Sequence, residues 1–123
     1  MKEVLKAVLI DSANQEVREV EFSDYQDIQR FVFPDMPTTF GAFNLFGEKG
    51  DHTVYYDDES LCRDPSCIMG AVWWPRIYMQ PLLNNLIVTG IGSNGESTDC
   101  KIPVKEIQAQ IQFIQRSELV RAD

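Results

Sequence analysis

The chain has 123 residues, of which 44% are hydrophobic and 24% are charged. This is the size of one domain with one core, because two separately packed domains need more chain. Nineteen acidic residues against eleven basic ones give a net charge of −8, which argues against nucleic acid as a direct partner, since phosphate contacts require clustered cations.

Two further features indicate the compartment in which the protein is expected. No apolar run reaches the roughly 20 residues that span a bilayer, and the opening stretch MKEVLKAVLI alternates charged with apolar side chains instead of forming a signal peptide. Three cysteines are an odd number, which fits a reducing compartment better than a disulfide framework. We therefore expect a cytoplasmic protein that does not contact a membrane.

The first third of the chain reads as a hairpin followed by a helix. Val4–Ile10 and Glu16–Phe22 have strand composition and flank the turn-forming segment DSANQ, with Glu19 and Glu21 facing outward. Ser23 begins a capping-box signature, and apolar residues then recur at helical spacing until a proline. The pattern predicts a short helix from about residue 24 to 32.

The middle of the chain predicts a second hairpin and a long loop. Thr39–Phe46 and His52–Asp57 are strand-like and are separated by the turn segment GEKGD. Asp58–Gly70 has no periodicity, and Ala71–Leu83 is apolar but contains two prolines. We expect the first of these segments to be a loop and the second an extended edge segment with a turn.

The last third predicts a buried strand, a hairpin and a helix. Leu86–Ile91 is the buried strand, and Asn94-Gly95 is a turn signal before the strand-like Ser97–Ile102. Pro103 marks the entry of an amphipathic helix, whose apolar stripe consists of Val104, Ile107, Ile111 and Ile114.

Hairpin-linked strands dominate this pattern, and strands do not alternate regularly with helices. The sequence therefore predicts a single α+β domain over residues 1–123. We expect a mainly antiparallel sheet of about five to seven strands, with the short helix and the C-terminal amphipathic helix packed on one face.

A glycine-rich motif resembles a dinucleotide-binding loop, but the segment that follows it does not fit one. Residues 90–95 match G-x-G-x-x-G after a strand, but no helix begins there to receive a pyrophosphate. The motif is better explained as a hairpin turn, and we expect no cofactor.

The cysteines and the single histidine leave one metal hypothesis open. In principle Cys62, Cys67, Cys100 and His52 form a Cys₃His zinc set, although the spacing is wider than in zinc knuckles. The alternative is that the thiols are small buried hydrophobes.

Acidity is concentrated in two stretches. Residues 11–35 carry seven acids and two bases, and residues 48–64 carry six acids and two bases, whereas the rest of the chain sums to +1. Asp57, Asp58 and Glu59 form the densest cluster, which is either a solvated strand end or a contact surface for a basic partner.

Trp73 and Trp74 are adjacent in an extended segment, so their side chains point in opposite directions and one core cannot bury both. An exposed indole is typical of a docking surface, but it also serves to cover an open sheet face. Both interpretations remain open.

Several segments are similar to a family of small proteins of unknown function found in phages and bacterial mobile elements. The resemblance extends from Lys6 to about Phe113, departs at Cys62–Tyr78, and implies a compact α+β domain in a bacterial or phage setting without transferring a catalytic residue. The segments that carry it are KAVLID at Lys6–Asp11, YYDDESL at Tyr55–Leu61, QPLLNNLIVTG at Gln80–Gly90, and the isoleucine-rich final helix.

These observations favour a non-enzymatic domain that docks on, and inhibits, a basic protein such as a nuclease, toxin or defence factor. The alternative is a small metal-assisted or ligand-binding enzyme that uses the 58–70 loop with Cys62, Cys67 and His52. A homodimer formed through the Trp73 segment is a third hypothesis. The residues expected to bind the partner are Asp57, Asp58, Glu59, Trp73, Trp74 and Tyr55.

Overall fold

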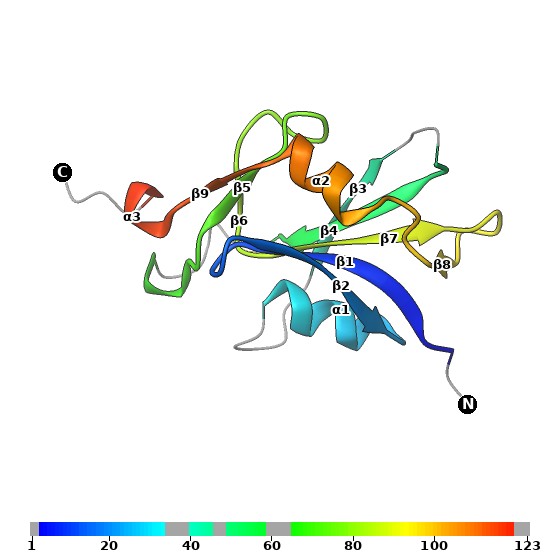
Figure 1. Ribbon diagram of the computed structural model, residues 1–123. Helices are drawn as coiled ribbons and strands as arrows, with labels where there is room; N and C mark the ends of the chain where they lie inside the picture. Colours follow the sequence, from blue (N-terminus) through cyan, green and yellow to red (C-terminus); the bar gives the residue numbers. More distant parts are fainter. Residues whose placement is uncertain (1–2, 34–39, 46–48, 59–64, 120–123) are drawn as a thin grey trace.

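The computed structural model describes residues 3–33, 40–45, 49–58 and 65–119. Its main sheet has six strands in the order β2-β1-β7-β4-β3, with β8 pairing to β7, and every neighbouring pair is antiparallel (Figure 1). The strands are β1 (Leu5–Asp11), β2 (Glu16–Phe22), β3 (Phe40–Leu45), β4 (His52–Asp57), β7 (Leu86–Ile91) and β8 (Ser97–Thr98).

A second sheet and three short helices complete the fold. The sheet has the order β6-β5-β9, and in the described part of the chain no helix is both long and apolar enough to cross a membrane. The remaining elements are α1 (Tyr25–Val32), the 3-10 turn η2 (Pro65–Cys67), β5 (Ala71–Trp73), β6 (Leu82–Leu83), α2 (Val104–Gln110), β9 (Gln112–Ile114) and α3 (Arg116–Leu119).

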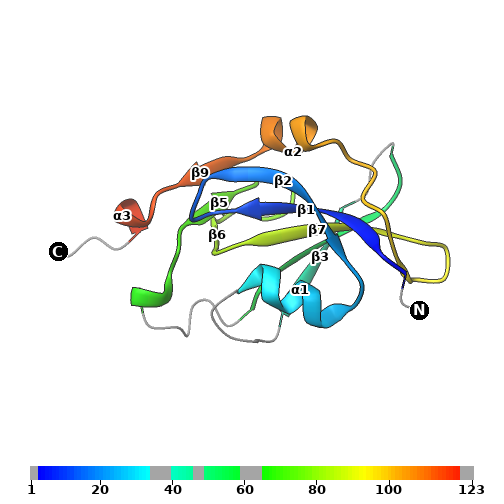
Figure 2. The same ribbon diagram turned by 60° about the horizontal axis from the view of Figure 1, so that its bottom comes forward.

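The main sheet is buried on both faces. Because strand residues point alternately to the two sides, Ala7 and Ile87 pack towards α1 while Val8 and Val88 pack towards the second sheet and α2. Figure 2 shows α1 below the sheet and α2 above it. The α+β class is confirmed, but the two helices lie on opposite faces instead of sharing one.

The predicted C-terminal helix is shorter than its apolar periodicity suggested. The helix α2 ends at Gln110, and Ile111 is already extended, with φ −117° and ψ 161°. The next residues form β9, in which Phe113 pairs with Val72 and Ile114 with Ala71. Sheet pairing to β5 overrides the helical spacing here because the segment IQFI suits a strand equally well.

The local signals of turns and caps are largely confirmed. Asp24, one residue later than expected, caps α1 by accepting from the amides of Gln26 and Asp27, and the Asp27 carboxylate accepts from the Ser23 amide at 2.8 Å. The glycine motif is a hairpin turn, closed by the Gly92 amide donating to the Glu96 carbonyl at 2.8 Å.

The two tryptophans are expected to differ sharply in their effect on stability. Trp74 is fully buried, so Trp74→Ala should lower the free energy of unfolding by about 3–5 kcal/mol. Trp73 is 39% exposed, and Trp73→Ala should lower it by about 1 kcal/mol or less. Urea denaturation of both variants measures the difference, and equal losses would contradict this assignment of the core.

Candidate functional site

Of the three aromatic residues expected at an interface, one is clearly at the surface. Trp74 lies in the core, where its indole N–H donates to Gln110 Oε1 at 3.1 Å. Tyr55 is half-buried and packs against the residues beneath α1. Trp73 is the exposed indole, so the two side chains do part as the extended backbone requires.

The acidic cluster of β4 does not form one surface. Asp57 is fully buried, whereas Asp58 is exposed, and Glu59 lies outside the described residues. Asp57 Oδ2 accepts from the Asn84 side-chain amide at 3.4 Å, which makes this carboxylate part of the interior.

Asn84 is the centre of a buried hydrogen-bond network at one end of the main sheet. Its side-chain Oδ1 accepts from the Met69 backbone amide at 2.8 Å. Its backbone amide donates to the Gly70 carbonyl at 2.8 Å. Its carbonyl accepts from the Ser12 hydroxyl. Asn84 thereby joins the segment after β1, the end of β4 and the segment before β5.

Asn85 extends this network to the helix. Its Oδ1 accepts from the Ser12 amide at 3.0 Å, and its Nδ2 donates to the Phe31 carbonyl at 3.0 Å. The carbonyl in the last turn of α1 is thus satisfied by a side chain from the sheet. The sequence pattern predicts no role for the Asn84-Asn85 pair, because it does not reveal which buried groups these side chains meet.

His52 is held as a neutral structural side chain. It is fully buried, and its Nε2 lies 3.0 Å from the Lys101 amide while its Nδ1 lies 3.1 Å from the Gly50 carbonyl. Since the amide must donate and the carbonyl must accept, the proton sits on Nδ1. Burial lowers the pKa of His52, the Lys101 charge lowers it further, and the Gly50 carbonyl opposes both.

The proposed zinc set is not assembled in the part of the chain that the structure describes. The Cys100 thiol donates to the Ile102 carbonyl at 3.7 Å, and burial raises its pKa. Cys67 lies half-buried in η2, and Cys62 falls outside the described residues. The Nε2 lone pair of His52, which a metal would need, already accepts from the Lys101 backbone amide. The described residues contain no cluster of three metal-ligating side chains.

Three exposed carboxylates lie on β2, an outermost strand of the main sheet. Glu16, Glu19 and Glu21 are all exposed on this strand. Lys6 contacts Glu19 at 3.8 Å from the neighbouring strand, and Arg18 contacts Glu16 at 3.3 Å. The outward position of Glu19 and Glu21 was predicted, but their place on a sheet edge was not.

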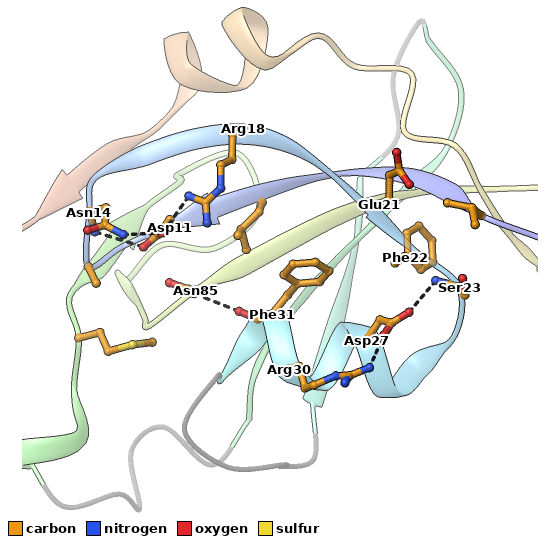
Figure 3. Close-up of a pocket in the computed structure, with 14 residues that line it drawn as sticks. Asp11, Asn14, Arg18, Glu21, Phe22, Ser23, Asp27, Arg30, Phe31 and Asn85 are labelled. Atoms are coloured by element: carbon orange, nitrogen blue, oxygen red, sulfur yellow. Dashed lines mark hydrogen bonds and ion pairs between the residues drawn. The ribbon is translucent and has the colours of Figure 1, made fainter.

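A groove of about 760 Å³ lies beside this strand, between the β1–β2 hairpin and α1 (Figure 3). The helix α1 is short and packs mainly over β7 and β4, so it covers the two outer strands only in part. Ala7 and Phe22 still pack with Ile28 and Val32, whereas Arg18 lines the groove. Leu9, Phe22 and Phe31 contribute its apolar lining. Its volume is sufficient for several side chains of a partner.

An ion pair lies at each end of the groove. Arg18 Nη1 donates to Asp11 Oδ2 at 2.9 Å at one end, and Arg30 donates to Asp27 at the other. Burial alone would raise the pKa of Asp11, but hydrogen bonds from Asn14 and Arg18 outweigh it and bring the pKa below 3.8. Asp11 therefore stays ionised and holds Arg18 against the groove.

The side chain and the backbone of Asn84 can be tested separately. Asn84→Gly keeps the left-handed conformation (φ +68°) but leaves the Met69 amide unpaired, so the free energy of unfolding should fall by about 2–3 kcal/mol. Asn84→Ala should cost a further 1–2 kcal/mol or so, because a Cβ is strained at this φ. Equal stabilities of the two variants in urea denaturation would contradict the backbone contribution.

The state of His52 predicts a pH dependence of stability. The folded pKa lies below the ordinary value of 6.5, so the unfolded chain binds the proton more readily. His52 should stabilise the fold fully above pH 6.5 and lose this contribution as the pH falls towards its folded pKa. Because the chain has one histidine, urea denaturation between about pH 7.5 and 5.5 should show this loss, and His52→Gln should remove it. A wild-type stability that is flat over this range would refute the assignment.

In comparisons with known protein families, with curated proteins and with solved structures, no match to this chain is found. The resemblance to a family of phage and mobile-element proteins therefore stays a prediction.

Proposed function

We propose that the protein is a small non-enzymatic binding domain that docks on a basic protein and inhibits it. The observation that carries the proposal is the set of three exposed carboxylates on β2, with Glu19 and Glu21 on one face of the strand and Glu16 on the other. These side chains are placed on a rigid sheet, so they meet a partner without first having to be ordered.

The charge around β2 is locally one-sided. Glu16 and Glu19 have side-chain exposures of 61% and 59%, and their cationic neighbours are Arg18 and Lys6. Arg18 is already shared with the buried Asp11, so it neutralises little of the outer charge. Such a negative strip accelerates the encounter with a positive partner and orients it.

Only some of the residues proposed from the sequence are exposed and can contact a partner. Asp58 and Trp73 are exposed and belong to the proposal as secondary contacts, the first through charge and the second through apolar area. Asp57 and Trp74 are fully buried, so they do not contact a partner directly. A bacterial or phage setting, taken from the family resemblance, makes a basic nuclease, toxin or defence factor the expected class of partner.

Charge reversal on β2 tests the proposal. Affinity capture from a bacterial lysate with the wild-type protein should retain a basic protein, which is then identified and purified. With that protein, Glu19→Lys/Glu21→Lys should slow association about tenfold at low salt and flatten its salt dependence.

The control variant is Glu118→Lys, a single charge reversal at an exposed position in α3. It is compared with Glu19→Lys, which makes the same single reversal on β2. Glu118→Lys should leave the association rate within about twofold of the wild type, because its charge is not on the strand proposed to meet the partner. Capture of no basic protein, or equal rates for the two single variants, would refute the proposed function.

A further inference from the structure

We infer that the outer edge of β2 is a strand-addition site. Its occupant is an extended segment of a partner protein in which basic and apolar residues alternate. This inference rests on the proposed function and specifies the binding mode at the same surface. Four observations support it: the unpaired edge, the division of charge between the two sides of β2, the groove beside it, and the charge that disfavours a second copy as occupant.

The edge of β2 is unpaired among the described residues. The strand pairs with β1 along its full length, from Glu16 opposite Asp11 to Phe22 opposite Leu5, and has no strand on its other side. The helix α2 packs against β2 on the face that carries Val17. An unpaired edge of this length presents amides and carbonyls that an incoming strand can match.

The two sides of β2 differ in chemistry. Val17, Glu19 and Glu21 point to the face covered by the second sheet and α2, and Val17 is buried there. Val20 and Phe22 point to the opposite face, towards α1, and pack with the residues beneath it. Glu16 and Arg18 share that second face nearer the hairpin turn. Opposite Glu19–Phe22, an added strand continues the alternation, so its successive residues would lie beside carboxylates and beside apolar side chains in turn.

The groove gives the apolar residues of such a strand a place to pack. It lies on the α1 side, and its apolar lining includes Phe22 of β2 together with Leu9, Phe31 and Met69 (Figure 3). Side chains from a strand next to β2 would project to this same side. The opposite side of that strand would carry the cations that pair with Glu19 and Glu21.

Charge disfavours a second copy of the chain as the occupant. Antiparallel pairing of β2 with itself along its full length sets Glu19 opposite Glu19 and Glu21 opposite Val17, so neither glutamate meets a cation from the other copy. The net charge of −8 on each copy adds repulsion. A basic segment would pair with the glutamates and would not be repelled by the net negative charge.

Two short synthetic peptides of identical composition test the inference. One alternates lysine with valine, and the other has its lysines and valines grouped in two blocks. The alternating peptide should bind about tenfold more tightly by fluorescence anisotropy, because only it can place lysines beside both Glu19 and Glu21 while its valines face the groove. It should also slow hydrogen exchange of outward-facing amides in residues 16–22, whereas N-methylation of alternate peptide nitrogens should abolish both effects.

A charge-swapped pair provides the matched control. The Glu19→Lys/Glu21→Lys protein should lose affinity for the lysine–valine peptide and gain affinity for a glutamate–valine peptide, which a misfolded variant would not do. Glu118→Lys should bind the original peptide as the wild type does. Equal binding of the alternating and block peptides, or protection outside β2, would overturn strand addition. If the captured basic protein still depends on Glu19 and Glu21 in that case, the proposed function stands without this binding mode.

Discussion

The buried pair Asn84-Asn85 is the interaction on which the arrangement of this protein depends. It lies where β7 begins, and its side chains and backbone satisfy groups from Ser12, Met69, Gly70 and Phe31. These residues come from three separate stretches of the chain, since Met69 and Gly70 are adjacent. Buried amides and carbonyls must find partners, so the network fixes where those stretches meet.

This constraint also determines where the surface is left open. Asn85 holds the end of α1 through the Phe31 carbonyl, and Asp24 with Asp27 fixes its beginning. A helix held at both ends over the centre of the sheet covers β1 and β2 only in part. The groove and the acidic edge strand follow from the position and shortness of α1.

The negative charge of the β2 glutamates acts both on self-association and on the choice of partner. They protect an unpaired sheet edge from pairing with a second copy of the chain, since like charges would face each other. They also select a partner of opposite charge for the same edge. An acidic edge strand therefore combines protection against self-association with specificity for a basic segment, without requiring a catalytic group.

The sequence by itself determined the features that depend on neighbours along the chain. The hairpins, the start of α1 and the turn at residues 92–96 follow from side-chain alternation, capping carboxylates and glycine, which act over a few residues. The separation of Trp73 from Trp74 follows from the pleat of an extended backbone alone.

Only the tertiary structure decided which of those elements meet. The pattern of Ile111 and Ile114 fits a helix and a strand equally well, and pairing with β5 selected the strand. Asp57 and Glu19 are both charged strand residues, yet one is sealed beside Asn84 and the other lies on an open edge. Long-range pairing sets that difference, because burial of a carboxylate depends on the polar partners that the fold brings to it and not on its neighbours in sequence.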